Sequence, residues 1–338
     1  MDLNYLWFFI VGFLFIGYFV LDGFDFGVGM SLPFLGKDDT DRRVLINTIG
    51  PVWDLNETWL IVAGAALFAA FPEWYASLFS GFYLALLLIL VALILRGVSF
   101  EYRHQGKGLK WTKWFDGMIV FGSAVPALLW GVAFANLIQG VPMDAAHNFT
   151  GTLFTLLNPY GLLGGLTTLM LFFTHGVIFV SLKTDGELRE RARALASKAG
   201  VITVLVAATF LVWTILQHLD APHLWAIVGL AGLAAVSLIG AWLLNRAGLE
   251  GRAFAAMVFT IIFAVGTILA ALFPNVMPAS NDPSFGLTIE NASSTPYTLT
   301  VMTWVAAFSL PLVLGYQAWT YWIFRKRVLR SSIPASTH

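Results

Sequence analysis

Two short acidic motifs inside long apolar stretches hold the residues of this sequence that are best suited to chemistry. One is DGFD at 22–25 and the other is WDLNETW at 53–59. Each holds two carboxyl groups three residues apart, and a helix would place such a pair on adjoining faces one turn apart. A carboxyl group in a low-dielectric site can hold a proton near neutral pH and pass it on. The residue types therefore indicate proton binding or proton transfer.

Other charged side chains could join these acids in one buried cluster, because they fall near the same ends of neighbouring apolar stretches. The candidate cluster consists of Asp22, Asp25, Asp54, Glu57, Arg96 and Asp116, with Trp53, Asn56 and Trp59 as candidate supporting side chains. Two interpretations stay open: a proton-conducting cluster, or an ion-paired girdle in which Arg96 neutralises one acid. Among the acids, we expect Asp54 to be buried and Asp22 and Asp116 to be interfacial.

His175 falls in the middle of an apolar stretch, where it could bind haem iron, carry a proton or form a packing hydrogen bond. Haem-carrying membrane proteins usually show His or Met ligands inside their helices, and here His175 stands nearly alone. We therefore predict no haem ligand and no metal site in this chain. The sequence has no cysteine, which excludes disulfides, iron–sulfur clusters and covalent CxxCH haem attachment.

The composition requires lipid as the solvent for much of the chain. Of the 338 residues, 58% are hydrophobic and only 11% are charged, whereas an ordinary soluble domain carries about 25% charged residues. Such a chain could not cover itself with a water-compatible surface. The 19 basic and 19 acidic residues give a net charge of zero, which implies no nucleic acid or other polyanionic partner.

Nine apolar stretches are long enough to cross the hydrocarbon core, which takes about 20 residues of helix. They cover about 5–29, 54–71, 75–96, 116–138, 160–182, 199–217, 224–244, 253–273 and 299–323. No basic residue precedes the first stretch and no cleavage motif follows it, so we interpret it as a retained helix. The sequence predicts an all-α integral membrane protein, with residues 1–338 in one polytopic domain. Two four-helix bundles plus a ninth helix would fit the rhythm of the loops.

The positions of the basic residues predict the orientation in the membrane. All 19 Lys and Arg residues fall within 37–43, 96–113, 183–198, 246–252 and 325–330. These segments are alternate loops and the tail of a nine-helix chain, and basic loops stay on the cytoplasmic side during insertion. We therefore expect the N-terminus outside and the C-terminus in the cytoplasm.

Seven segments carry a resemblance to a known family. They are LDGFDFGVG (21–29), INTIGPVWDLNETWLI (46–61), GAALFAAFPEWYASLFSGFY (64–83), RGVSFEYR (96–103), GVAFANLIQGVP (131–142), LNPYGLLGGL (157–166) and LTVMTWVA (299–306). Together they resemble subunit II of the cytochrome bd-type quinol oxidases, from the first predicted helix to the last. The WDxNExWL and GVAFxNLxQGVP blocks are specific, because hydrophobicity alone does not produce them.

The resemblance implies a nonredox subunit of a respiratory terminal oxidase, which oxidises quinol and reduces oxygen to water in the bacterial cytoplasmic membrane. In this family haem b, haem d and the quinol oxidation loop belong to subunit I, the expected partner. Small single-helix accessory subunits are further candidate partners, and quinone is both a substrate and a candidate structural ligand. Contacts with oxygen and lipids are also expected.

The resemblance further implies that this subunit supports assembly, proton delivery and oxygen access. The family's proton route runs along the subunit interface, and its carboxylates fall on Asp25 and Asp54 here. Asp22, Glu57 and Arg96 lie close by in the sequence motifs. Some family members have a longer outer segment where this chain has only 218–223, so contacts that depend on that insertion are not implied.

Two alternatives compete with this expectation. A proton-coupled secondary transporter would also carry acids in its helices, but it would need a substrate cavity at the middle of the membrane. A purely structural scaffold would tolerate neutralisation of the acids without loss of turnover.

Overall fold

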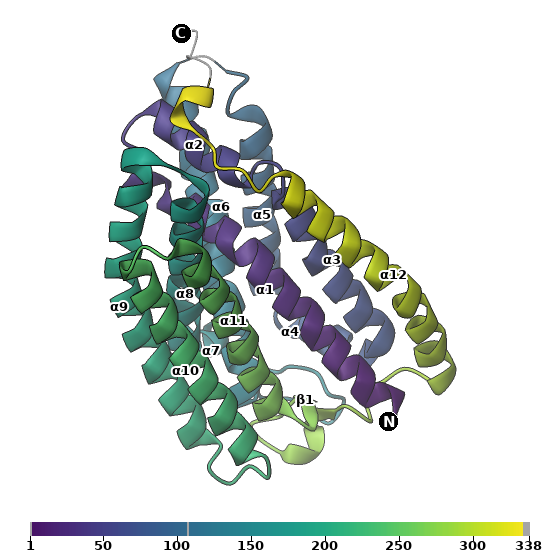
Figure 1. Cartoon of the computed structure of the whole chain (residues 1–338). Coiled ribbons are helices and arrows are strands. Elements are labelled where there is room, and N and C mark those ends of the chain that lie inside the picture. The colour runs from purple at the N-terminus through teal and green to yellow at the C-terminus, as the bar shows by residue number, and fades with distance from the viewer. Residues whose placement is uncertain (1, 107, 334–338) are drawn as a thin grey trace.

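The computed structural model describes residues 2–106 and 108–333, and it is built almost entirely of helices. The basic residue Lys107 lies outside these ranges. Figure 1 shows long helices packed side by side, with short elements at both ends of the bundle. The helices are α1 (Leu3–Leu35), α2 (Asp39–Ile49), α3 (Trp53–Ala70), α4 (Pro72–Gly81), α5 (Tyr83–Tyr102), α6 (Leu109–Gln139), α7 (Leu153–Leu156), α8 (Pro159–Lys183), α9 (Gly186–Gln217), α10 (Leu224–Arg246), α11 (Glu250–Leu272) and α12 (Pro296–Ile323). Two strands, β1 (Asn275–Met277) and β2 (Leu287–Thr288), pair antiparallel, and two short 3-10 turns are η1 (Pro283–Phe285) and η2 (Arg330–Ser332).

Eight helices in the described ranges are long and apolar enough to cross a membrane: α1, α5, α6, α8, α9, α10, α11 and α12. The predicted all-α class is therefore confirmed. The predicted span 54–71 corresponds to α3, which is not among the eight and carries Asp54, Asn56 and Glu57 in its first two turns. Nine membrane crossings and their orientation stay predictions.

Hydropathy placed several helix ends wrongly. The predicted span 75–96 is interrupted: α4 ends at Gly81, and the membrane-length helix α5 begins at Tyr83. The stretch is apolar on both sides of this break, so hydropathy alone does not reveal it. Helices α6 and α9 begin earlier than predicted, because their first turns are polar but still helical. The predicted first loop contains α2, whose N-cap Asp38 accepts a 2.8 Å hydrogen bond from the Asp41 amide.

The long helices pack in two groups with a shared border. In the first group α1 contacts α3 and α6, and α6 contacts α5. In the second group α8 contacts α9, α9 contacts α10, α10 contacts α11, and α11 returns to α8. At the border, a Cβ atom on Gly27 of α1 would lie 2.7 Å from the Gly176 Cα atom of α8. Small residues at this crossing therefore let the two groups approach closely.

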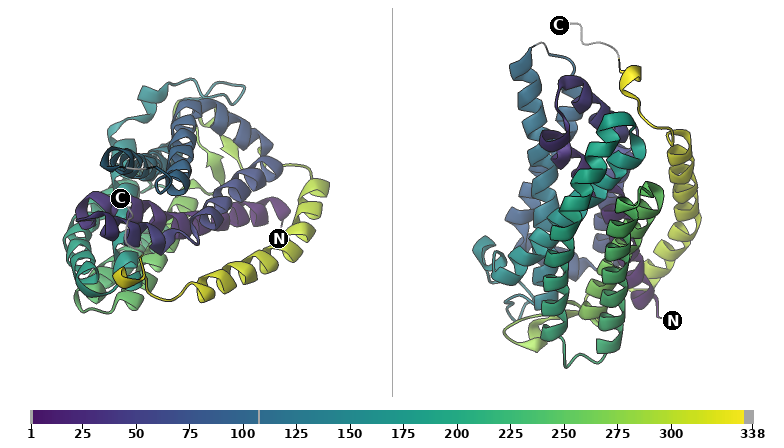
Figure 2. Two further views of the ribbon diagram at one scale, coloured as in Figure 1. Left: turned by 90° about the horizontal axis from the view of Figure 1, so that it is seen from above. Right: turned by 60° about the vertical axis from the view of Figure 1, so that its left-hand side comes forward.

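Helix α12 stands at the edge of the molecule. It contacts α1 and α3, and only 6% of its most apolar window is buried in this chain, against 72% for α8. The view from above shows α12 beside the bundle and not within it (Figure 2). The start of α1 and the end of α12 lie at opposite ends of the bundle (Figure 1).

Loops close the end of the bundle where α1 begins. The Asn281 amide donates to the Met143 carbonyl at 2.8 Å and accepts from the Met143 amide at 3.0 Å. The His147 ring nitrogen lies 2.7 Å from the Phe285 carbonyl. These contacts join the segments after α6 and after α11 into a cap over this end of the bundle.

Candidate functional site

Arg96 of α5 is the centre of a buried charged group that joins three helices. Its side chain is fully buried, and Nη2 donates a 2.6 Å hydrogen bond to Asp22 Oδ1 of α1. Both Nη2 and Nε donate to Glu57 of α3, Nε at 3.2 Å. The guanidinium carbon lies 4.3 Å from the centre of the Phe26 ring, a cation–π geometry. One cation therefore holds two acids from two other helices.

Glycine on the neighbouring helix makes room for this arginine. A Cβ atom on Gly122 of α6 would lie 2.7 Å from the Arg96 Cβ atom and 3.0 Å from its backbone nitrogen. A larger residue at 122 would therefore push α6 away from α5. On α1, Asp22 and Phe26 stand four residues apart and share the helix face turned toward Arg96.

Asp25 is also fully buried, but a neutral side chain and not a cation binds it. The Asn56 amide of α3 donates a 2.7 Å hydrogen bond to Asp25 Oδ2. The Asn56 carbonyl oxygen accepts from the Tyr321 hydroxyl at 2.8 Å and from the Gln317 amide at 3.1 Å. Trp59 donates to Gln317 Oε1 at 3.0 Å. Because the Asn56 oxygen already has two donors, its NH₂ group is the end that faces Asp25.

We call Asp22, Asp25, Asn56, Glu57 and Arg96 the Arg96 cluster. It holds three carboxyl groups and one guanidinium. Within the described ranges, Asp22 Oδ2, Asp25 Oδ1 and Arg96 Nη1 are buried without a hydrogen-bond partner. An ionised carboxylate buried without a cation is costly, so the charge count favours a neutral form at one of these acids.

Two predicted members lie outside the Arg96 cluster. Asp54 is exposed on the surface of this chain, so the expectation that it is the buried acid is wrong for the isolated subunit. Its place in the first turn of α3 turns it away from the face that Asn56 presents to α1. Next to it, Trp53 packs against Phe100, with ring centres 5.1 Å apart.

Asp116 belongs to a separate ionic group near the end of α5. It accepts from Arg103 Nε at 2.6 Å and from Arg42 at 3.2 Å, and Arg103 also reaches Asp39 at 2.8 Å. Asp39 and Asp116 raise the pKa of Arg103 against the effect of its burial. Asp22, which we had expected at the interface, is instead fully buried beside Arg96, because that arginine supplies the charge that its carboxylate needs.

His175 of α8 is buried on the border between the two helix groups. Its Nε2 atom lies 3.1 Å from the Val20 carbonyl, and its ring stacks on Phe254 with centres 4.8 Å apart and planes 11° apart. Phe24 adds an edge contact. The Val20 carbonyl takes Nε2, Phe254 covers the ring, and Nδ1 is buried without a hydrogen-bond partner among the described residues. The geometry agrees with the packing alternative.

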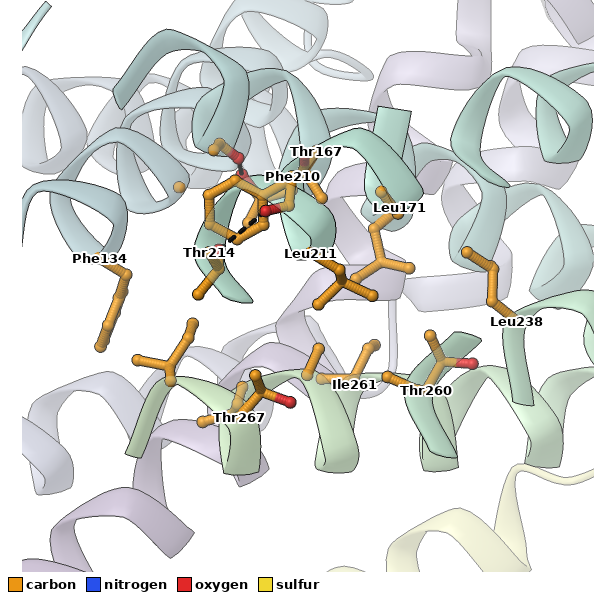
Figure 3. A pocket seen from close by; sticks show the side chains of 18 of the residues that line it. Phe134, Thr167, Leu171, Phe210, Leu211, Thr214, Leu238, Thr260, Ile261 and Thr267 are labelled. Atoms are coloured by element: carbon orange, nitrogen blue, oxygen red, sulfur yellow. Dashed lines mark hydrogen bonds between the residues drawn. The ribbon is translucent and has the colours of Figure 1, made fainter. Parts of the chain in front are cut away.

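An apolar cavity lies apart from the charged residues of the Arg96 cluster. It measures about 120 Å³ and lies between the second helix group, α8 to α11, and residues of α1 and α6 in the first group. Figure 3 shows Phe134, Leu171, Leu238 and Ile261 around it. Its threonine hydroxyls donate to backbone carbonyls of their own helices, as Thr260 does to Ala256 at 2.9 Å. The cavity therefore presents an apolar surface with no charged residue.

Gln317 and Tyr321 were not among the site residues predicted from the sequence. They stand four residues apart near the end of an otherwise apolar helix. Helix spacing places such a pair on one face. A glutamine within a long apolar stretch was the signal that could have drawn attention to α12.

The fold and the Arg96 cluster define a polytopic helical membrane protein with buried carboxyl groups at a helix junction. Comparison with known proteins identifies the family. Residues 3–324 match the family model of cytochrome bd terminal oxidase subunit II. The chain is 43% identical over 328 residues to cytochrome bd ubiquinol oxidase subunit 2 of Bacillus subtilis, covering 97% of both chains. It is 39% identical over 373 residues to cytochrome bd-I ubiquinol oxidase subunit 2 of Escherichia coli, covering 99% of this chain and 98% of the relative.

A solved structure has the same fold. A chain of the bd oxidase from Geobacillus thermodenitrificans superposes with a TM-score of 0.79 at 18% identity, covering 96% of this chain and 99% of that one. The chain belongs to the family of cytochrome bd terminal oxidase subunit II. It is thus a multi-pass bacterial membrane protein and a subunit of a quinol:oxygen oxidoreductase, with a subunit I as partner.

Proposed function

We propose that this subunit delivers protons for oxygen reduction through the Arg96 cluster, with Asp25 as the acid that binds and releases them. The observation that supports this most is the difference between Asp25 and its neighbours. Asp22 and Glu57 share the Arg96 guanidinium, whereas Asp25 has only the neutral Asn56 amide. Asp25 is therefore the acid whose charged and neutral forms are both accessible.

Oxygen reduction consumes protons at a buried site, so a carrier must hold a proton away from water and then give it up. Asp25 Oδ2 is held by Asn56, while Oδ1 is buried without a partner among the described residues. Protonation at Oδ1 removes the uncompensated negative charge, and release toward the partner subunit restores it. Arg96 keeps a permanent positive charge nearby, which makes the charged form attainable.

We further propose an arrangement of the whole complex on the basis of the family resemblance. Haem b and haem d would reside in subunit I and perform the electron transfer, with no haem in this chain. Quinol would be oxidised at the outer side of the bacterial cytoplasmic membrane, and the nine predicted crossings would put the Arg96 cluster toward the cytoplasm. Quinone as a structural ligand, small accessory subunits and an oxygen path are further proposals, of which the apolar cavity supports the last.

The test is the turnover of the purified complex with Asp25→Asn, since asparagine keeps the size of the side chain but cannot titrate. Quinol oxidation should slow by about tenfold or more, as when a general acid–base group is removed. Haem content and yield should stay near those of the parent. Asp54→Asn is the second variant. Asp54 is exposed on this chain and would join the proton route only at the subunit interface, so its substitution should also slow turnover.

A structural role for the cluster predicts the reverse pattern. Asp25→Asn would then assemble poorly, and the complex that survives would turn over normally. Full assembly with parental turnover in Asp25→Asn would refute proton delivery through this residue. A proton-coupled transporter would instead show activity in the single purified chain.

A further inference from the structure

Residues 324–333, here called the C-terminal segment, fold back across the end of the bundle after α12. The Lys183 ammonium at the end of α8 donates to the Phe324 carbonyl and, at 2.9 Å, to the Lys326 carbonyl. The Val328 amide donates to the Lys183 carbonyl at 2.8 Å. Lys183 therefore fixes the beginning of the C-terminal segment against the end of α8.

An ion pair fixes the far part of the C-terminal segment. Arg330 donates to Asp38 at 2.5 Å and also to Asp41, and both acids belong to the start of α2. Arg330 holds the pKa of the Asp38 carboxyl below its usual value. Arg191 of α9 donates to Asp41 from the other side at 2.7 Å. The C-terminal segment thus spans from α8 to α2 and is fixed at both places.

A cavity of about 600 Å³ lies under the C-terminal segment. Its walls come from the C-terminal segment, the end of α2 and the turn that follows it, and the ends of α8, α11 and α12. Asn47 and Thr48 contribute polar atoms from the last turn of α2, and Tyr321 lines the cavity from α12. The cavity is several times larger than the apolar one in the second helix group, which measures about 120 Å³.

Tyr321 connects this cavity to the Arg96 cluster. Its ring lines the cavity, and its hydroxyl donates to Asn56, whose amide donates to Asp25. Only one side chain therefore separates the cavity wall from the buried acid. Asp54 has no such connection, because it joins none of these contacts.

The composition of α12 supports a role in this connection. Most of the helix is exposed in this chain, and its buried residues are Leu299, Gln317 and Thr320. The Gln317 amide and, one helical turn later, the Tyr321 hydroxyl both donate hydrogen bonds to Asn56. Helix α12 buries little apolar surface in this chain, yet it has polar groups where it reaches the Arg96 cluster.

We infer that the cavity under the C-terminal segment is the entrance through which protons from the cytoplasm reach Asp25, with Tyr321 as the hydroxyl at its inner end. This inference rests on the proposed proton delivery through Asp25. It adds the place of entry and a positioning role for Tyr321 and Gln317. It makes α12 and the C-terminal segment parts of the route.

The step moves one proton without other chemistry. A proton that arrives through water in the cavity at Tyr321 moves on past the Tyr321 hydroxyl to Asp25 Oδ1, and the carboxylate thereby loses its negative charge. The Asn56 amide does not carry the proton, because an amide does not titrate near neutral pH. Asn56 holds Oδ2, and the two donors on its oxygen keep its NH₂ group turned toward Asp25.

Three of the basic residues that line the cavity have partners within this chain. Lys183 is bound by two carbonyls, Arg327 donates to the Leu182 carbonyl at 3.2 Å, and Arg325 lies over the Trp322 ring at 4.4 Å. Water carries a proton past such fixed cations by exchange between neighbouring molecules. The same cations would attract a small anionic reagent, which suits the test below.

The first test uses the absence of cysteine from this chain. Asn47→Cys places one thiol on the exposed wall of the cavity, and Arg252→Cys places one on an exposed helix start outside it. Inside-out vesicles that contain the whole complex are treated with an anionic methanethiosulfonate reagent that does not cross membranes. Modification should slow quinol oxidation about tenfold in Asn47→Cys and leave Arg252→Cys unchanged. The treated parental complex controls for cysteines of the partner.

The second test is Tyr321→Phe, which keeps the ring in the cavity wall and removes the hydroxyl. Turnover should fall about fivefold, as expected for loss of one positioning hydrogen bond, with the quinol KM and haem content unchanged. A merely structural role would lower the yield of complex and leave turnover per haem intact. The solvent deuterium isotope effect on turnover should rise, because proton supply becomes slower.

The outcomes separate this inference from the proposed function. If modified Asn47→Cys and Tyr321→Phe both keep parental turnover while Asp25→Asn is slow, protons reach Asp25 by another entrance and this inference is wrong. If Asp25→Asn itself keeps parental turnover, proton delivery through Asp25 fails first. Modification that slows Arg252→Cys equally would show a general effect of the reagent and would also overturn the inference.

Discussion

The two helix groups have similar packing and opposite interiors. The group of α1, α3, α5 and α6 encloses Arg96 with Asp22 and Glu57, whereas the group of α8 to α11 surrounds an apolar cavity that α1 and α6 close on one side. Polar atoms occur in both interiors. The difference lies in where those atoms find their partners.

In the second group the hydroxyls are satisfied locally. Thr260, Thr267 and Thr214 each donate to the carbonyl four residues earlier in their own helix. Thr214 also contacts the Tyr160 hydroxyl of α8 at 2.7 Å, but it keeps its partner in its own helix. In the first group Arg96 is satisfied only by other helices, since its acids come from α1 and α3. The buried charge therefore depends on other helices for its partners, whereas each of these threonines has a partner in its own helix.

The strongest way to break this comparison is Arg96→Met. The change leaves Asp22 and Glu57 buried or half-buried without their cation, and loss of one partner of a buried pair costs about 3–5 kcal/mol. The yield of haem-containing complex should fall sharply, measured from its reduced-minus-oxidised optical spectrum. Arg246→Met, at an exposed arginine that lies over Trp242, is the matched control and should assemble normally.

Normal yield and thermal stability in Arg96→Met would show that the acids accept burial without the cation. The ionic contacts of Arg96 would then contribute little to the stability of the complex. The expected defect is one of assembly, so it also separates Arg96 from Asp25, whose substitution should spare assembly.

The sequence predicted the membership of the Arg96 cluster better than its geometry. Asp22, Asp25, Glu57 and Arg96 could be found because charges in apolar stretches are costly and few. Burial of Asp22 and exposure of Asp54 could not, because both acids stand near helix ends and hydropathy does not give the rotation of one helix against another. The direction of a side chain depends on packing, which is a tertiary property.

The same limit applies to the helices. Long apolar stretches predicted the membrane-length helices, but the break at Phe82 and the helical part of α9 before residue 199 depend on local backbone contacts. Gln317 and Tyr321 were missed for a further reason. Each has an ordinary polar side chain near a helix end, and only the arrival of Asn56 from α3 makes them part of the site.

A smaller effect is expected at the border between the two interiors, where His175→Ala tests whether the histidine has a role with haem. His175 bonds the Val20 carbonyl and stacks on Phe254, so its loss leaves a small cavity and removes one hydrogen bond between α8 and α1. The thermal midpoint of the complex should fall by a few degrees. All haem bands in the optical spectrum should remain, and disappearance of a band would show that His175 serves a haem group after all.

The smallest effect should come from filling the apolar cavity with Ala264→Leu. Ala264 lines the cavity on α11, and the added atoms occupy part of a volume of about 120 Å³ without meeting a charged group. Stability should change by no more than about 1–2 kcal/mol, the range for hydrophobic changes in a site that has room. Ala255→Leu, on an exposed position of the same helix, is the control for the change in side-chain size.

Turnover at saturating oxygen should equal that of the parent in both variants, because no step of proton delivery touches this cavity. At low oxygen the two variants diverge only if the cavity is part of an oxygen path, and Ala264→Leu would then show a raised KM for oxygen while Ala255→Leu would not. A fall in turnover at saturating oxygen in Ala264→Leu alone would mean that the apolar interior, too, participates in the chemistry, and the contrast between the two helix groups would no longer hold.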